Sequence, residues 1–373
     1  MHPISLCVFM DSLSSRVKRV FEHCDKSLEQ IIIVNTGAAD PNFLYLSGFT
    51  SGLFEYSYLL VSQGSVTLLT SVLEYETARS EASKEMEVIC INSSKELSEH
   101  LEKFAEGKKI GINEGFVPYL TYKGIKKRAK PKKIVDISDA LLETRIIKDD
   151  EEIARIRKAV GITKLALVLI QKEFVEGMTE LQLASKFDGL SSSLGSEEPS
   201  FKTIVCFGKN AALPHHFPDD TKLRRGDFIL IDAGAKVRNY CSDLTRTFIF
   251  GEEVLKENKD YLEKKRMYDT VKQAQLKAIR AIKPDLKGKD IHNIAQEYID
   301  NAFSGEYRGR FIHSLGHSIG IEVHDGQGFS PNSDLVLKPG MIISVEPGIY
   351  LPGFGGVRIE DDILIEDDGA LVL

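Results

Sequence analysis

Short apolar runs rich in β-branched residues alternate with amphipathic stretches through roughly the first 140 residues of the chain. Such alternation is typical of an α/β layer domain. The apolar runs predict strands at residues 31–34, 58–61, 66–69, 88–91, 109–112 and 134–135. Between them, apolar side chains recur three and four residues apart. This spacing predicts helices at residues 14–24, 73–83 and 95–105.

A charged segment at residues 143–152 follows this part of the chain and leads into a long helical pattern. The pattern has one apolar stripe, made by Ile153, Ile156, Val160, Thr163, Leu167, Ile170 and Phe174. We expect Gly177 to end this helix and Thr179 to cap the next one. The predicted organisation is therefore a domain at residues 1–142, a linker at 143–152 and a second domain at 153–373.

The second domain alternates strand pairs with helices. Strands are expected at residues 203–207, 228–233, 240–250, 341–345 and 359–365, and helices at residues 258–282 and 289–303. Two hairpin-like units, near 228–250 and near 341–365, each contain two isolated carboxylates. A duplicated fold with a shared central site would require this arrangement.

Composition narrows the class of protein. A formal charge of -7 and a pI near 5.8 give no basic surface for nucleic acid. The apolar stretch at residues 4–10 is too short to span a membrane. The cysteines are scattered and form no CxxC pair, so the sequence predicts neither a disulfide framework nor a zinc knot. Free thiols indicate a reducing compartment, and we expect a cytoplasmic protein. The cysteines are Cys7, Cys24, Cys90, Cys206 and Cys241.

Five residues near the ends of apolar strands are candidates for metal binding. Asp232 ends one run and Asp243 opens the next, so folding of the hairpin should bring these carboxylates side by side. Glu346 and Glu360 occupy similar settings further along the chain. His317 lies in a segment with three imidazoles within twelve residues, and neutral imidazole is a common metal ligand. Because an unpaired buried carboxylate is very costly, this group needs a cation.

Four carboxylates and one imidazole suit a particular class of metal centre. Their charge is enough for two divalent cations. Ligation rich in oxygen with one His favours Mn²⁺, Co²⁺ or Zn²⁺ and excludes copper or iron–sulfur sites. A pair of such ions polarises a carbonyl group, which is the chemistry of metal-assisted amide hydrolysis.

The motifs around these residues resemble those of the pita-bread metallopeptidases, in particular the Xaa-Pro dipeptidases (prolidases) and Xaa-Pro aminopeptidases. The motifs are IDAG at 231–234, SDLTRT at 242–247, HSLGH at 313–317, VEPGIY at 345–350 and GVRIED at 356–361. Residues 42–49 (NFLYLSGF) resemble a turn and strand of the creatinase/prolidase amino-terminal domain. The resemblance implies an α/β and α+β fold. A creatinase-like α/β domain would precede a pita-bread catalytic domain, in which a duplicated αβ unit forms an antiparallel sheet.

The resemblance also implies roles for the metal-binding set. Asp232 would chelate one ion, and His317 and Glu346 the other, while Asp243 and Glu360 would bridge both. Glu346 would also act as general base. Two divalent ions per subunit follow, with Mn²⁺ expected and Co²⁺ or Zn²⁺ as alternatives.

Further residues match positions around the substrate in the same families. His215, rather than the neighbouring His216, matches the substrate-facing His, and His324 matches the His that stabilises the tetrahedral intermediate. Phe201 and Val323 match the wall of the proline pocket, although either could equally be core. His313 matches a hydrogen-bonded His that is not a ligand. Arg358 is expected to hold a metal-bridging carboxylate in place.

The expected activity is hydrolysis of the peptide bond before proline, in dipeptides or short peptides, by a homodimer. Residues 325–330 contain no cation, whereas some prolidases have an Arg here that grips the substrate's terminal carboxylate. This departure argues against strict dipeptidase behaviour and leaves Xaa-Pro aminopeptidase activity as an alternative. A methionine aminopeptidase is another alternative for the substrate. A metal-free relative with a binding or hydrolytic role is a further one, against which the retention of all five ligand positions argues.

Overall fold

The computed structural model describes residues 13–37, 39–251 and 259–373. The apolar stretch at 4–10 and Cys7 therefore lie outside the described residues. The chain divides into two compact units, Met1–Arg145 and Ile146–Leu373, and each is described by itself. No helix in the described ranges has both the length and the apolarity needed to cross a membrane.

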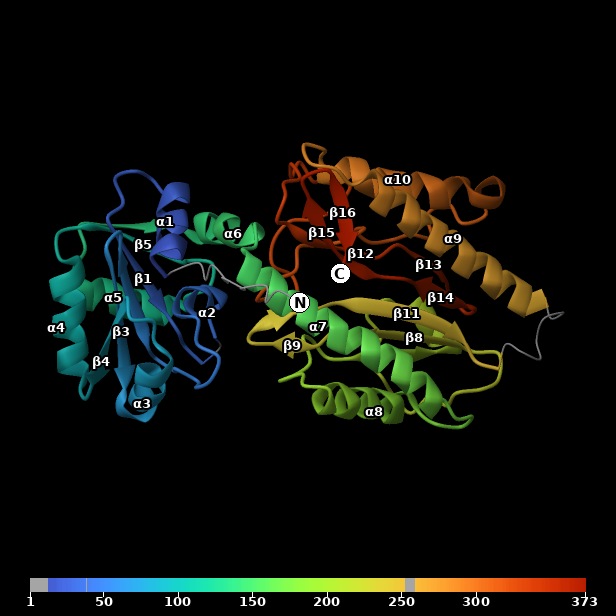
Figure 1. The fold of residues 1–373 in the computed structure, drawn as a ribbon, viewed down its shortest axis with the longest axis horizontal. Coiled ribbons are helices and arrows are strands. Elements are labelled where there is room, and N and C mark those ends of the chain that lie inside the picture. The colour runs from blue at the N-terminus through green and yellow to red at the C-terminus, as the bar shows by residue number, and fades with distance from the viewer. Residues whose placement is uncertain (1–12, 38, 252–258) are drawn as a thin grey trace, which may run out of the picture. The chain divides into compact units, whose positions relative to one another are not determined.

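Unit 1 is built on a six-stranded mixed sheet in the order β4-β3-β2-β1-β5-β6 (Figure 1). All the strands predicted in this region are confirmed. They are β1 (Gln30–Val34), β2 (Tyr58–Ser62), β3 (Ser65–Ser71), β4 (Met86–Ile91), β5 (Lys109–Ile112) and β6 (Lys133–Asp136). β2 pairs antiparallel with both β1 and β3, and the other pairings are parallel. The alternation of strands and helices thus gives the α/β domain that it predicted.

The predicted helices of unit 1 are also present, together with three that were not predicted. The former are α1 (Leu13–His23), α3 (Val72–Glu81) and α4 (Ser94–Ala105), and the latter are α2 (Pro41–Ser47), α5 (Tyr119–Ala129) and α6 (Ser138–Ile146). Buried apolar residues of the sheet pack against α4 and α5, which gives unit 1 a core of its own.

Helix α2 corrects the interpretation of residues 42–49 as a turn and strand. The Asp40 side chain accepts a hydrogen bond from the Asn42 N–H, which makes Asp40 the N-cap, and Pro41 occupies the first helical position. Proline suits that position because its missing N–H would have no partner there. Gly48 ends the helix in the left-handed conformation (φ 71°), and its N–H bonds to the Leu44 carbonyl.

Unit 2 begins with α7 (Asp150–Leu169), whose Asp149 and Glu152 form a capping box. The helix gives way to a short 3₁₀ turn, η1 (Ile170–Glu173), so the prediction that it runs to Gly177 was wrong. In the predicted stripe, Ile153 and Phe174 are only half-buried, whereas the five residues between them are buried. The next helix, α8 (Glu180–Ser193), starts after its N-cap Thr179, as predicted.

A three-stranded antiparallel sheet in the order β11-β8-β7 follows. Its strands are β7 (Ile204–Phe207), β8 (Phe228–Ala233) and β11 (Leu244–Ile249), with the 3₁₀ turn η2 (Gly208–Ala212) after β7. A short ribbon of β9 (Lys236–Val237) and β10 (Tyr240–Cys241) precedes β11. The strand expected at 240–250 is thus interrupted at Ser242 and Asp243. There the Asp243 N–H bonds to the Asp362 side chain rather than to a neighbouring strand.

The second three-stranded sheet has the order β12-β15-β16, and a hairpin of β13 and β14 accompanies it. The strands are β12 (Ile342–Val345), β13 (Gly348–Leu351), β14 (Gly355–Arg358), β15 (Asp361–Glu366) and β16 (Gly369–Val372). The strand predicted at 359–365 therefore starts two residues later, and β13, β14 and β16 were not predicted. The two predicted helices are α9 (Lys259–Ala281) and α10 (Gly288–Asn301), and the turn η4 (Ala302–Gly305) follows α10. Residue 258 lies outside the described part.

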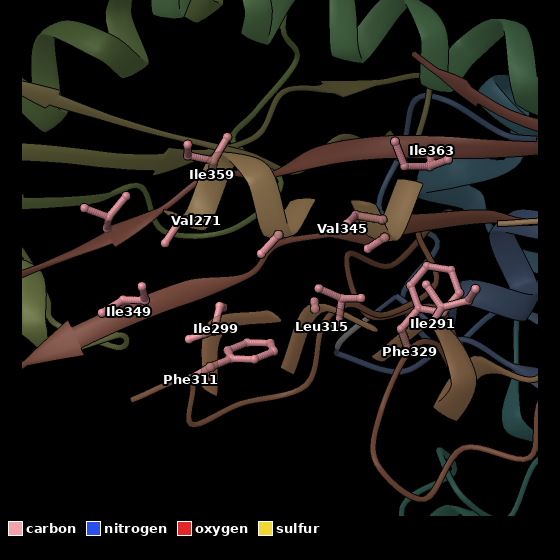
Figure 2. Packing of buried hydrophobic residues seen from close by; sticks show 14 of the residues in the cluster. Val271, Ile291, Ile299, Phe311, Leu315, Phe329, Val345, Ile349, Ile359 and Ile363 are labelled. Carbon is pink, nitrogen blue, oxygen red and sulfur yellow. The ribbon is translucent and has the colours of Figure 1, made fainter. Parts of the chain in front are cut away.

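The core of unit 2 lies where α9 and α10 pack on strands β12 to β15 (Figure 2). Val271 of α9 and Ile291 and Ile299 of α10 belong to the same buried cluster as Val345 and Ile363. The apolar face of these strands is thus filled by helices.

Candidate metal centre

A cavity of about 510 Å³ in unit 2 contains every site residue predicted from the sequence. Its lining includes Phe201, His215, Asp232, Asp243, His313, His317, Val323, His324, Glu346, Arg358 and Glu360. These residues come from segments that lie far apart in the chain. The fold of unit 2 therefore brings the predicted set together.

The two aspartates come from neighbouring strands, but the strand register differs from the prediction. Asp232, in β8, lies opposite Thr245 of β11. Asp243 precedes β11 and is a diagonal neighbour of Asp232, since residues that pair with j also lie near j±2. The two carboxylates are therefore diagonal neighbours on the same face of the sheet rather than directly opposite each other.

The two glutamates lie at one end of the ladder between β12 and β15. Val345 pairs with Asp361, so Glu346 and Glu360 are the next positions of the same register. His317 belongs to a segment that packs closely on β12. A Cβ atom on Gly316 would lie 1.8 Å from the Ser344 carbonyl oxygen. Only glycine allows this approach, and the Ser344 hydroxyl then accepts a hydrogen bond from the His317 N–H at 3.1 Å.

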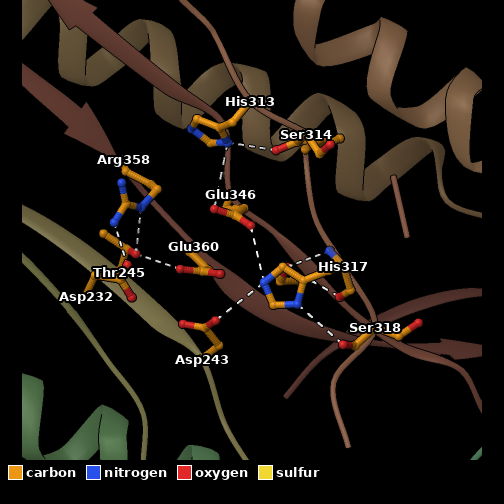
Figure 3. Close-up of polar contacts among 12 residues, drawn as sticks. Asp232, Asp243, Thr245, His313, Ser314, His317, Ser318, Glu346, Arg358 and Glu360 are labelled. Carbon is orange, nitrogen blue, oxygen red and sulfur yellow. Dashed lines mark hydrogen bonds and ion pairs between the residues drawn. The ribbon is translucent and has the colours of Figure 1, made fainter. Parts of the chain in front are cut away.

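The ligand atoms face one another across a small space (Figure 3). His317 Nε2 lies 3.5 Å from Asp243 Oδ2 and 3.5 Å from Glu346 Oε1. Asp243, His317 and Glu360 each offer a donor atom within 4.8 Å of the others. These separations exceed ordinary hydrogen bonds and leave room for a cation among the donors.

Unpaired oxygen atoms provide a test of whether the residues fit divalent metals. Asp232 Oδ1, Asp243 Oδ1 and Glu360 Oε1 are buried and have no hydrogen-bond partner in the described part of the chain. Buried polar atoms are otherwise almost always bonded. Three such oxygens lining one cavity, next to a neutral imidazole, match the oxygen-rich ligation that Mn²⁺, Co²⁺ and Zn²⁺ accept. The residues fit the metals.

Burial controls the protonation of this site in the absence of a cation. Burial raises the pKa of the Asp243 and Glu360 carboxyl groups well above their usual range, and the neighbouring carboxylates raise both further. Burial raises the pKa of Glu346 to about 8. Burial also lowers the pKa of His317 to about 4, so this imidazole is neutral. Divalent cations would favour the ionised carboxylates, and the neutral imidazole is already in its ligand form.

Arg358 is buried and organises two of the carboxylates. Its Nη2 pairs with Asp232, and its Nε donates to the Thr245 hydroxyl at 3.1 Å. Thr245 in turn donates to Glu360 Oε2 at 2.6 Å. The prediction gave Arg358 a metal-bridging carboxylate as partner. The structure gives it Asp232 directly and Glu360 only through Thr245.

His313 uses both ring nitrogens in hydrogen bonds. Nδ1 lies 2.8 Å from the Ser314 carbonyl, and Nε2 lies 2.8 Å from the Tyr350 hydroxyl. Burial lowers the pKa of His313 to about 4, so the ring is neutral with its single proton on Nδ1, and Nε2 accepts from Tyr350. The Tyr350 oxygen itself accepts from Arg358 Nη1 at 3.0 Å. No nitrogen of His313 remains for a metal.

The remaining predicted residues line the cavity. The His324 ring lies 4.0 Å from that of His317, centroid to centroid, and burial lowers the pKa of His324. Phe201 and Val323 are half-buried and line the cavity, so they are wall residues rather than core. His215 is exposed at the same cavity.

Sequence reasoning missed three residues that hold the ligands. Thr245 lies two positions after Asp243 and so faces the same side of β11, a signal that was available. Asp362 Oδ2 accepts from the Asp243 N–H at 3.0 Å, and burial raises the Asp362 pKa to about 8. Tyr350 joins Arg358 to His313. No pattern marked these last two, because their contacts depend on how the strands meet.

Comparison with known proteins places this geometry in a family. The model of metallopeptidase family M24 matches residues 154–367, and that of the creatinase/prolidase N-terminal domain matches residues 16–147. An Xaa-Pro dipeptidase of Pyrococcus horikoshii is 37% identical over 361 residues, with 97% of each chain covered.

Two solved structures are similar over nearly the whole chain. An Xaa-Pro dipeptidase from Bacillus anthracis has a TM-score of 0.86 at 30% identity and covers 97% of each chain. An X-Pro aminopeptidase from Thermotoga maritima has a TM-score of 0.84 at 32% identity, again over 97% of each chain. The chain therefore belongs to metallopeptidase family M24, with a creatinase/prolidase amino-terminal domain ahead of the pita-bread catalytic domain.

Proposed function

We propose that this protein hydrolyses the peptide bond before proline in Xaa-Pro dipeptides or short Xaa-Pro peptides, using two divalent metal ions per subunit. One observation supports this above all. Three buried carboxylate oxygens without hydrogen-bond partners line a single cavity, in a chain whose similar proteins over nearly full length are named Xaa-Pro dipeptidase and X-Pro aminopeptidase.

The proposed ligand roles are those that the family resemblance implies. Asp232 would hold one ion, His317 and Glu346 the other, and Asp243 and Glu360 both. We expect Mn²⁺, with Co²⁺ or Zn²⁺ as alternatives, since the oxygen-rich donor set accepts all three ions. When bound, the ions would supply Lewis-acid polarisation of the scissile carbonyl.

Side chains of the protein would transfer protons and stabilise the charge that develops on the substrate. Glu346 would accept the proton of the attacking water, and its pKa of about 8 before metal binding marks a carboxylate whose basicity burial has raised. His324, which is neutral at pH 7 because its pKa is lowered, would donate a hydrogen bond to the oxygen of the tetrahedral intermediate. His215 would contact the substrate backbone at the cavity mouth.

Recognition of proline would rest on the ring. The bond before proline is a tertiary amide without an N–H, so the strand-like pairing used by general peptidases is not available. Phe201 and Val323 offer a partly exposed apolar wall in the cavity. We infer that the prolyl bond must be trans, because the ring has to face this wall while the carbonyl faces the metals.

Gly328 supports activity on peptides longer than dipeptides. A Cβ atom there would lie 2.4 Å from the Gly316 carbonyl oxygen and 2.5 Å from His317 Cα. No side chain fits at this position, so the cavity wall has no cation here to grip a terminal carboxylate. Xaa-Pro aminopeptidase activity is therefore the second candidate. A metal-free binding role is disfavoured, because it would leave the unpaired carboxylate oxygens without a function.

The proposal extends to the domain bounds, the cellular compartment and the oligomeric state. We propose residues 1–142 as the amino-terminal domain, 143–152 as the linker and 153–373 as the catalytic domain. The four cysteines in the described residues are free, which supports a reducing compartment and hence the cytoplasm. The homodimer is proposed from the resemblance. The acidic pI of 5.8 supports the absence of a nucleic-acid partner.

The test is hydrolysis by metal-stripped protein resupplied with Mn²⁺, Co²⁺ or Zn²⁺. Ala-Pro should be cleaved far faster than Ala-Ala, and the difference in rate between Ala-Pro and Ala-Pro-Ala should be smaller than in prolidases that carry the Arg. Equal turnover of Ala-Ala and Ala-Pro would refute the proline specificity while leaving a metallopeptidase. Preference for Met-Ala-Ser would instead indicate a methionine aminopeptidase, and strong discrimination against Ala-Pro-Ala would restore the strict dipeptidase.

A further inference from the structure

A second cluster of titratable side chains lies outside the metal centre. Glu180, His216 and Asp219 have ligand-type atoms within 4.8 Å of one another. The Glu180 side chain is fully buried, at 0% exposure, although it is the first residue of α8. A buried carboxylate needs compensating partners, so the arrangement calls for a functional or structural explanation.

Hydrogen bonds already fill both oxygens of Glu180. Oε1 accepts from the Phe207 N–H at 2.6 Å and from Asn210 Nδ2 at 3.0 Å. Oε2 accepts from His216 Nε2 at 2.7 Å and from the Asp219 N–H at 3.1 Å. The unpaired oxygens of the metal centre show the opposite pattern. This cluster is therefore a set of satisfied hydrogen bonds and not a further metal site.

The bond to Glu180 determines the tautomer of His216. A carboxylate can only accept, so His216 Nε2 must carry the proton. Asn210 Nδ2, 3.2 Å from the same nitrogen, is also a donor and finds its acceptors in Glu180 and in the Thr221 hydroxyl at 3.1 Å. His216 Nε2 thus donates its proton to the hydrogen bond with Glu180 and cannot also act on a substrate.

One carboxylate consequently holds the segment 207–219 at several points. Phe207 ends β7, Asn210 lies in η2, and His216 and Asp219 belong to the loop that follows. The backbone of α8 adds a bond from the Leu181 N–H to the Asp219 carbonyl at 3.2 Å. These hydrogen bonds to α8 therefore hold the segment in place at several residues.

Close packing fixes the same segment from its other side. A Cβ atom on Gly356 of β14 would lie 2.1 Å from the Ala211 carbonyl oxygen, so η2 sits directly on the strand that leads to Arg358. His215 lies within the segment and lines the cavity. No hydrogen bond of its side chain occurs among the described residues. The position of His215 is therefore set by its neighbours, chiefly by His216.

We propose that Glu180 and His216 are positioning residues, whose buried hydrogen bond holds His215 at the mouth of the metal cavity. The two adjacent histidines have different roles. His215 meets the substrate, and His216 anchors the loop that presents it. This inference rests on the proposed role of His215 and extends it to a pair of residues that touch neither metal nor substrate.

The test compares variants of His216 in the metal-loaded enzyme acting on Ala-Pro. His216→Leu removes the donor at similar volume, whereas His216→Gln keeps an amide N–H near the position of Nε2. A hydrogen bond to a charged group corresponds to about a tenfold to hundredfold change. His216→Leu should lose kcat/KM by that factor, mainly through KM, with metal content unchanged. His216→Gln should restore most of the loss.

A double-mutant cycle separates positioning from general loosening. If His216 acts through His215, then His215→Ala and the double variant His215→Ala/His216→Leu should have equal kcat/KM. Additive losses, failure of His216→Gln to restore activity, or a fall in kcat alone would overturn the inference. If His215→Ala itself keeps full kcat/KM, then the proposed role of His215 fails instead, which is a distinguishable result.

Folding of the leucine variant does not limit the test. If His216→Leu lowers the melting temperature too far for assay, His216→Asn replaces it. Asn and Gln carry the same amide, but the amide N–H of Asn stops one methylene short of the Glu180 carboxylate. Higher KM for His216→Asn than for His216→Gln at equal metal content is the expected result. Equal KM values for the two variants would overturn the proposal.

Discussion

Removing the metals should leave a protein whose stability falls as the pH rises. Burial raises the folded-state pKa of Glu346 from 4.5 to about 8. A raised pKa means that the folded protein favours the protonated carboxyl more than the unfolded chain does. The associated stability is fully present below the unfolded pKa and is lost as the pH rises through the folded pKa. Asp362, whose pKa burial also raises to about 8, acts in the same direction.

The size of the effect follows from the width of that window. Each unit of pKa difference corresponds to about 1.4 kcal/mol. Between about pH 6.5 and pH 8, Glu346 alone should lower the free energy of unfolding by on the order of 2 kcal/mol. His317 works in another range, because its pKa is lowered to about 4. Its stabilising contribution, like that of His313, grows as the pH rises from about 4 to about 6.5 and opposes the Glu346 term there, so the predicted fall is confined to about pH 6.5 to 8.

Urea unfolding of chelated and Mn²⁺-loaded protein, at pH values from about 6.5 to 8, measures this directly. The metal-loaded protein should keep or gain stability over the range, since the cation displaces the same protons. Glu346→Gln is the matched control. Gln has nearly the same shape as Glu but does not titrate, so the free energy of unfolding of metal-free Glu346→Gln should fall less steeply with pH. Constant or rising stability of the metal-free wild type from about pH 6.5 to 8 would refute the reasoning.

Three further predictions concern individual side chains. Asp243→Ala and Glu360→Ala should each lose both metals and several orders of magnitude in rate, because each is proposed to bridge. Elemental analysis that finds two ions in either variant would contradict that role. His324→Ala should keep its metals and lose roughly 10² to 10⁴ in rate, whereas loss of metal would make His324 a ligand. Thr245→Val should weaken metal binding about 10- to 100-fold in a competition titration against a chelator, while Thr245→Ser should not. Equal affinities of these two variants would show that the hydroxyl does not orient Glu360.

The periodic parts of the chain were predictable, and the exceptions have physical reasons. Strands β1 to β6 appear where the apolar runs predicted them, because a buried strand needs such a run and little else. The helix at Pro41 was read as a turn and strand. Proline fixes φ near the same value at the start of a turn and in the first turn of a helix. Gly48 favours the helix over the turn and strand, because its left-handed φ of 71° allows the C-cap. The sequence shows the glycine but not the angle.

The residues of the metal centre were predictable, but the hydrogen bonds and ion pairs among them were less so. The carboxylates could be found because each lies in a recognisable motif at or near the end of an apolar strand, and His317 because it lies in a segment rich in imidazoles. The partner of Arg358 could not, since it depends on strand register. A shift of one residue changes which side chains face each other. The observed register sets Thr245 opposite Asp232, and this is why Arg358 reaches Asp232 directly and Glu360 through a hydroxyl.

Histidine illustrates where sequence reasoning reaches its limit. His313 and His317 lie four residues apart in one segment and share a lowered pKa of about 4 from burial. Both are neutral imidazoles, yet only one can bind a metal. Two hydrogen bonds occupy the ring nitrogens of His313, whereas His317 Nε2 lies 3.5 Å from each of two carboxylates. The same contrast separates His215 from His216. An imidazole's function is therefore decided by the partners of its ring nitrogens, and the deciding partners, Tyr350 for His313 and Glu180 for His216, come from distant parts of the chain.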